Sequence, residues 1–130
     1  MGACYTVRVY LLCHDDSFLV NATKNFVKAW GGEAVFPEIE IVDLTTALQV
    51  IFTKRGLYKT DEDTRIECYH FPEDRCWESD FDASYGWEIV MVEWFKYVAP
   101  YHVDGSELYI APDTDWDELI IKNGQCIQTH

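Results

Sequence analysis

The chain has 130 residues, of which 48% are hydrophobic and 15% aromatic, and its formal net charge is −13. This composition excludes a disordered chain, and the length suits one domain that buries about two thirds of its unfolded surface. No apolar run reaches the ~20 residues that a membrane-spanning helix needs. The N-terminus shows no basic region followed by a cleavage site, and we therefore expect a single cytoplasmic domain over residues 1–130.

The acidic residues are concentrated in the second half of the chain. Residues 1–59 contain six acids and six bases, whereas residues 60–130 contain 17 acids and four bases, which accounts for the whole net charge. A field of this sign repels nucleic acid and membranes and attracts basic protein surfaces. The alternative is an acidity that serves solubility alone.

The first half of the chain predicts strands that alternate with helices. Residues 3–13 alternate between two faces, and Tyr10 and Leu12 add apolar side chains to the second face, so we expect a central strand covered on both sides. A helix follows from about residue 15 and ends at Gly31-Gly32. Residues 38–42 alternate as a second, short strand. Asp43 then caps a second helix, which ends at Gly56.

Two acidic loops and a third strand occupy the middle of the chain. Residues 60–63 form the first loop and residues 65–71 the strand. The second loop, residues 72–82, is strongly acidic and contains Trp77 and Phe81. Aromatic side chains within a charged rim are typical of a protein interface, and they are also typical of a loop folded onto its own core.

A long amphipathic helix is predicted from Ala83 to about Ala99. Asp82 or Ser84 can cap its start, and Pro100 ends it. Gly86 costs about 1 kcal/mol if it lies inside the helix. Apolar side chains at helical spacing form one stripe, which consists of Trp87, Val90, Met91, Trp94, Phe95 and Val98.

The C-terminal part predicts three short strands. Residues 107–110 alternate, residues 112–115 turn the chain, and residues 116–122 form the next strand. Asn123-Gly124 then separates this strand from residues 125–128, and Asn-Gly between two such segments is the strongest short hairpin signal. We expect an antiparallel meander here.

These elements predict an α+β or α/β fold with the order β-α-β-α-β-α-β-β-β. Three helices would pack on a mixed sheet of about five to six strands, in two or three layers.

Three groups of residues have the types that metal sites or catalysis require. Asp113 to Asp117 has the start of a calcium loop, but the required Gly and Glu positions hold Glu118 and Gly124, so we expect a solvated turn. The other two groups are the possible zinc ligands Cys68, His70 and Cys76, with Cys126 or His102 as the fourth, and the possible thiol site Cys13-His14-Asp15.

The spacing is unfavourable for both of these sites. Zinc ligands usually include a close pair such as C-x-x-C, and adjacent residues on a strand point to opposite faces. We therefore expect reduced thiols, no metal and no cofactor. The chain has no P-loop, no dinucleotide-binding or hydrolase motif, and no basic patch with interleaved aromatics, so direct nucleic-acid binding is not expected.

The acidic second half supplies the predicted binding face, near the point where the meander and the loop over residues 72–82 lie closest together. Its expected residues are Asp61, Glu62, Asp63, Glu73, Asp74, Trp77, Glu78, Asp80, Tyr109, Asp113, Asp115 and Asp117.

One segment also shows a resemblance. The runs 97–101 and 104–110, the Asp-rich turn, Trp116 and Asn123-Gly124 resemble the C-terminal part of small acidic proteins of bacterial phages and integrative elements. The resemblance is confined to residues 97–124 and implies no catalytic residues. It implies a protein of a mobile element that binds a host or rival macromolecule.

The sequence thus predicts a non-enzymatic acidic protein-binding module. Its partner would be a basic protein surface that normally contacts nucleic acid, as with inhibitors of nucleases or immunity proteins, and carboxylates would occupy the sites of phosphates. The alternatives are a small metal-binding or thiol-dependent enzyme and a housekeeping domain whose acidity serves solubility.

Overall fold

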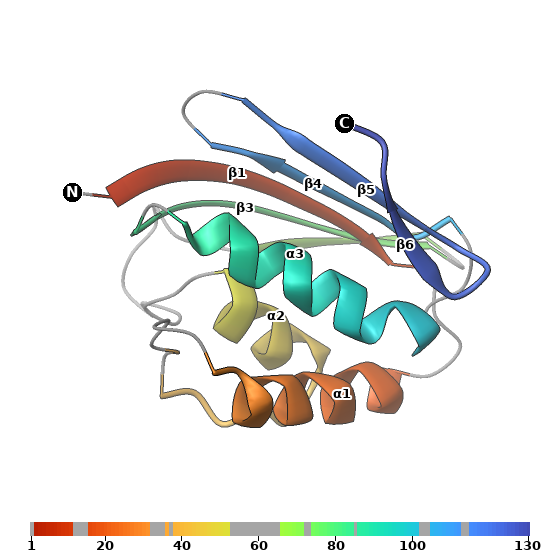
Figure 1. The fold of residues 1–130 in the computed structure, drawn as a ribbon. Coiled ribbons are helices and arrows are strands. Elements are labelled where there is room, and N and C mark those ends of the chain that lie inside the picture. Colours follow the sequence, from red (N-terminus) through yellow and green to blue (C-terminus); the bar gives the residue numbers. More distant parts are fainter. Residues whose placement is uncertain are drawn as a thin grey trace.

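The fold is described here from a computed structural model, which shows a sheet with helices on one of its faces (Figure 1). It describes residues 2–11, 16–31, 36, 38–52, 66–71, 74–84, 86–101, 105–112 and 115–130, and of residues 2–3, 45, 66–71, 74–84 and 101 it describes the backbone alone. The elements are β1 (Gly2–Leu11), α1 (Asp16–Ala29), α2 (Leu44–Phe52), β2 (Ile66–Phe71), β3 (Asp74–Ser84), α3 (Trp87–Val98), the 3-10 turn η1 (Ala99–Tyr101), β4 (Glu107–Ala111), β5 (Asp117–Lys122) and β6 (Gln125–Gln128).

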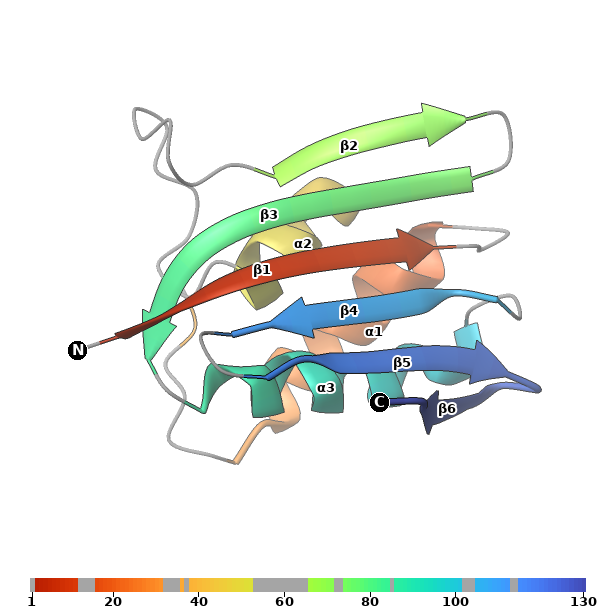
Figure 2. The same ribbon diagram turned by 90° about the horizontal axis from the view of Figure 1, so that it is seen from above.

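The strands form one sheet in the order β2-β3-β1-β4-β5-β6 (Figure 2). Each of the five pairings is antiparallel, so the α+β class is confirmed and the mixed sheet is wrong. The predicted element order is also wrong, because residues 38–42 form no strand and α2 is the next element after α1 among the described residues. Two helical connections remain, α1 with α2 between β1 and β2, and α3 between β3 and β4. Each joins two strands that run in the same direction with one antiparallel strand between them.

All three helices lie on the same side of the sheet and contact one another, which makes two layers (Figure 1). Along β1 the side chains of Tyr5, Val7, Val9 and Leu11 face the helices and are at most 1% exposed. The alternate residues Cys4, Thr6 and Arg8 are exposed, and Tyr10 is half-buried. The strand is therefore central, as predicted, but the expectation that both of its faces are covered is wrong. We call the helix side the closed face and the other side the open face.

Helix α3 presents its predicted apolar stripe to the sheet. All six residues of the stripe are buried, which confirms the pattern. The predicted start at Ala83 is wrong, because the helix begins at Trp87 and its N-cap is Gly86 with φ 93° and no side-chain cap. Gly86 thus supplies a positive φ that other residues adopt at a cost. Asp82 and Ser84, the predicted caps, lie on β3, and the N-cap position is two or more residues further along the chain.

The segment over residues 74–84 is a strand and not part of an acidic loop. It pairs with β1 along its whole length, from Gly2 opposite Ser84 to Leu11 opposite Arg75. Acidic residues are poor strand formers by themselves, and this is why the composition suggested a loop. Pairing outweighs that preference, because ten of the eleven residues lie opposite β1 and residues 74–79 lie opposite β2, which gives backbone hydrogen bonds on both sides of the strand.

The C-terminal meander is confirmed. Strand β4 pairs with β5, and β5 pairs with β6. The turn between the last two strands uses Asn123 with φ 54° and Gly124 with φ 72°. Two consecutive positive φ values match the type I′ turn that Asn-Gly favours, because its twist agrees with that of the strands.

The cap predicted for the second helix is confirmed as well. The amide of Thr46 donates to the Asp43 carboxylate at 2.8 Å, and the amide of Asp43 donates to the Thr46 hydroxyl at 3.0 Å. This reciprocal pair satisfies donors that the first turn of a helix leaves free. It fixes the start of α2 beneath the sheet.

Candidate binding face

The open face is built around β1, with β3 on one side and β4 and β5 on the other (Figure 2). Residues directly opposite each other in antiparallel strands belong to the same face, so the register groups them into rows across the sheet. Three acids of β3 are opposite exposed residues of β1, in the pairs Glu78 and Arg8, Asp80 and Thr6, and Asp82 and Cys4. The acidic positions of β3 therefore fall in the set that belongs to the open face.

The first row crosses five strands. It runs through Glu67, Glu78, Arg8, Tyr109 and Glu118, and each is the register partner of the next. The Arg8 guanidinium lies 5.7 Å from the centroid of the Tyr109 ring, within the range of a cation–π interaction. The row thus contains one basic residue, Arg8, and three positions occupied by glutamate.

The second row is more apolar and lies next to the first. Its members are Tyr69, Cys76, Tyr10, Glu107, Ile120 and Ile127. Tyr10 and Ile120 are half-buried, whereas Glu107 and Ile127 are exposed. This row thus offers apolar surface on both sides of a single carboxylate.

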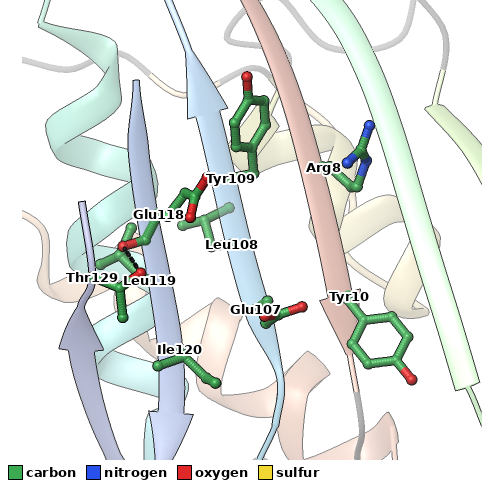
Figure 3. Close-up of a pocket in the computed structure, with 9 residues that line it drawn as sticks. All are labelled: Arg8, Tyr10, Glu107, Leu108, Tyr109, Glu118, Leu119, Ile120 and Thr129. Atoms are coloured by element: carbon green, nitrogen blue, oxygen red, sulfur yellow. Dashed lines mark hydrogen bonds between the residues drawn. The ribbon is translucent and has the colours of Figure 1, made fainter. Parts of the chain in front are cut away.

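A hollow of about 220 Å³ lies between these two rows, over β1, β4 and β5 (Figure 3). Figure 3 shows Glu118 beside Tyr109 on one side of the hollow, and Glu107 between Tyr10 and Ile120 on the other. The side chains of Leu108 and Leu119 are buried on the closed face, so backbone forms much of the floor. The residues around it are Arg8, Tyr10, Glu107, Leu108, Tyr109, Glu118, Leu119, Ile120 and Thr129.

The hollow suits a cationic group that carries an apolar stem. Glu107 and Glu118 are exposed and come from opposite sides of it. Two carboxylates attract a positive group, and aromatic or aliphatic walls favour the carbon chain that bears it. The hollow is open to solvent, so each single contact contributes little, and affinity requires several contacts together.

The structure brings together only some of the predicted binding residues. Glu78, Asp80 and Tyr109 fall in rows of the open face. Trp77 is opposite Val9, and Asp117 is opposite Ile110, so both belong to rows of the closed face. The register thus separates these two positions from Glu78, Asp80 and Tyr109, since neighbouring positions of a strand alternate between faces.

The remaining predicted residues are scattered. Asp74 pairs with Phe71 at the connection between β2 and β3, and Asp115 is exposed just before β5. Five predicted residues lie outside the described part of the chain, namely Asp61, Glu62, Glu73, Asp63 and Asp113. The expected contact between the meander and the segment over residues 72–82 is not direct, because β1 lies between β3 and β4.

Four residues of the open face were not predicted from the sequence, namely Arg8, Tyr10, Glu107 and Glu118. Strand alternation contains the signal for them, because they share the parity of exposed positions on their strands. The prediction was based on residue type instead, and it selected acidic and aromatic residues in the segments that were predicted to be loops. The neutral first half of the chain, through β1, thus provides the centre of the face.

A second polar cluster joins the end of the chain to β5. The rings of Trp116 and His130 stack at 3.9 Å between centroids, and His130 Nε2 lies 3.5 Å from Asp115 Oδ1. The Trp116 amide, together with His130, holds the pKa of the Asp115 carboxyl below its usual value. The cluster is exposed, so it attaches the last residues to the strand without forming a cavity.

Asp117 lies in a different electrostatic environment from Asp115. Burial, followed by the charges of Glu88 and Asp115, raises the pKa of its carboxyl. Gln128 donates to Asp117 Oδ1 at 2.8 Å and offsets part of this effect. Glu88 in turn accepts a 2.6 Å hydrogen bond from the buried hydroxyl of Tyr5. This group links β1, β5 and α3.

The described residues contain no group of three His, Cys, Asp or Glu side chains that could hold a metal ion. The register adds a reason against the Cys68, His70 and Cys76 set. Cys76 is opposite Tyr69, so it belongs to the row of the other face from Cys68 and His70. Cys126 is half-buried, and burial raises the pKa of its thiol. The other proposed ligands and the thiol site, Cys13, His14, Asp15 and His102, lie outside the described residues.

Comparison of the chain with known proteins finds no matching family model, no matching curated protein and no matching solved structure. Among the described residues, no helix is both long and apolar enough to cross a membrane.

Proposed function

We propose that this protein is an acidic protein-binding module whose open face docks on the basic, nucleic-acid-contacting surface of another protein. The observation that carries the proposal is the first row, in which the register aligns three carboxylate positions around Arg8 on a face that no helix of the described residues covers. The acids of β3 that share this face extend it along the strand.

The proposed mechanism is charge mimicry. Carboxylates spaced along strands would take the places that phosphates take on a nucleic acid, and a net charge of −13 would speed encounter with a basic partner. A protein of this kind acts as an inhibitor or an immunity protein, because it occupies the surface that its partner needs. Its origin on a phage or integrative element remains part of the same proposal.

The first experiment identifies the partner. The immobilised protein is exposed to a lysate of its host at low salt, and retained proteins are eluted with a short DNA duplex and then with salt. We expect nucleic-acid-binding proteins that the duplex displaces, because both ligands would use one basic surface. Retention that the duplex leaves unchanged, on partners without a basic face, would contradict charge mimicry.

The second experiment measures association with the purified partner. The pair Glu107→Lys and Glu118→Lys should slow association at low salt by about tenfold or more, since it reverses charges on the open face. The control pair Glu38→Lys and Glu40→Lys makes the same change in net charge on exposed residues of the segment that precedes α2. An equal effect of the two pairs would show that net charge acts without a docking face.

A further inference from the structure

We infer that the hollow between the two rows, over β1, β4 and β5, is a receptor for one arginine side chain. The inference deepens the proposed function, on which it rests for the identity of the partner as a basic protein. It names the part of the open face that recognises a single residue of the partner, and it names that residue as arginine.

The size of the hollow favours a side chain over a cofactor. Its volume is about 220 Å³, whereas pockets for small molecules measure roughly 300–1,000 Å³. It is also partly open to solvent, so a side chain of a partner can enter it.

The arrangement of charge favours a cation. Glu118 belongs to the first row and Glu107 to the second, so a positive group between the rows has a carboxylate on each side. An anion would meet the same two carboxylates. Arg8 is the base beside the hollow, and its guanidinium already lies near the ring of Tyr109.

The walls favour arginine over lysine. Tyr10 and Ile120 are half-buried and offer apolar surface for the methylene stem. A planar guanidinium is weakly hydrated, stacks on aromatic rings and binds a carboxylate through two parallel hydrogen bonds, whereas an ammonium does none of these as well. The approach of Arg8 to Tyr109 shows that this face accommodates such a group beside a tyrosine.

The test is an NMR titration of the ¹⁵N-labelled protein with capped single amino acids. N-acetyl-arginine methylamide should shift the backbone signals of residues 8, 10, 107, 109 and 118 with an affinity of about millimolar, as one solvated ion pair with stacking allows. The lysine analogue should bind several-fold more weakly. The citrulline analogue, which has the same shape and no charge, should leave the signals in place.

Two pairs of substitutions locate the site. Glu107→Gln with Glu118→Gln should remove most of the arginine-induced shift, and Glu38→Gln with Glu40→Gln should retain it at the same net charge. Thermal unfolding should show that both double variants are folded, since the substituted residues are exposed. Equal binding of arginine and citrulline, shifts elsewhere, or shifts caused by inorganic phosphate would overturn the inference.

The two proposals can fail separately. If capped arginine binds as expected and no basic protein is retained by the immobilised chain, the receptor stands and the proposed function is wrong. If basic proteins bind with the expected response to charge reversal and capped arginine produces no shift, the proposed function stands and the receptor is wrong.

Discussion

The two faces of the sheet differ in what their polar groups contact. On the closed face, Trp94 is fully buried and its Nε1 donates to the Thr23 hydroxyl at 2.8 Å, which in turn donates to the Leu19 carbonyl at 2.7 Å. On the open face, the carboxylates of Glu107 and Glu118 are exposed. Burial makes each unpaired polar group costly, whereas exposure lets charges remain solvated until a partner arrives.

The comparison places the buried polar contacts on the closed face and leaves the open face for the recognition that we propose. Successive residues of β1 belong to opposite faces, since Val9 is buried and Arg8 is exposed. Acidic residues that would destabilise a core are therefore compatible with a stable domain. Four sets of substitutions test how complete this separation is.

Replacement of Trp94 by alanine should have the largest effect. It removes a fully buried indole from between α1, α2 and the sheet, where the ring also meets Phe52 edge-on at 5.4 Å between centroids. We expect a loss of about 3–5 kcal/mol in the free energy of unfolding, measured by urea denaturation. Trp116→Ala is the matched control, since Trp116 is 42% exposed and should lose less than about 1 kcal/mol. Similar losses for the two tryptophans would contradict the comparison.

Replacement of Thr23 by valine should have the next largest effect. The shape is nearly retained, but the indole N–H of Trp94 loses its acceptor in a buried site. The expected loss is about 1–3 kcal/mol in thermal or urea unfolding. Thr23→Ser keeps the hydroxyl and should recover part of it. If serine is no better than valine, the hydrogen bond does not stabilise the core.

A pair of substitutions on β1 compares the faces directly. Val9→Thr introduces a hydroxyl on the closed face and should cost roughly 1–2 kcal/mol, because the site offers burial among apolar side chains. Thr6→Val makes the reverse change on the open face, where Thr6 is exposed, and should alter stability by less than about 0.5 kcal/mol. Unfolding in urea measures both. A large cost at Thr6 would show that the open face also contributes to stability.

The smallest effect is expected for Asp117→Asn. The pKa of the Asp117 carboxyl is higher in the folded protein than in the unfolded chain. The ionised carboxylate therefore destabilises the fold at a pH above the folded pKa. This destabilisation decreases as the pH falls and is absent below the unfolded pKa. Asparagine should therefore stabilise the protein at neutral pH by less than about 1 kcal/mol, after allowance for solvent screening. The gain should vanish in acid. Unfolding measured from pH 3 to pH 7 tests the direction, and a gain that is constant with pH would contradict it.

The closed face was largely predictable from the sequence. Strand alternation in β1 and the helical stripe of α3 identify residues that are buried in the structure, because a period of two or of 3.6 is a local property of the chain. The Asn123-Gly124 turn and the Asp43 cap are local as well, since each depends on the conformation of a few neighbouring residues.

The open face was not predictable in the same way. Residues 74–84 carry an acidic composition that favours a loop, and pairing with β1 and β2 makes them a strand. Their position also decides which acids share a face with Arg8, and that depends on contacts between segments about seventy residues apart in the sequence. Local preference contains no information about such pairing, because the stabilising hydrogen bonds come from a distant strand.

The sequence by itself determined the buried stripes, the hairpin and the concentration of negative charge in residues 60–130, and it left the α+β and α/β classes open. The tertiary structure alone decided that the sheet is wholly antiparallel, that its helices share one side, and that the charge is arranged in rows around β1. The physical reason is that patterning follows from each residue and its near neighbours, whereas strand order and register follow from which distant surfaces fit together.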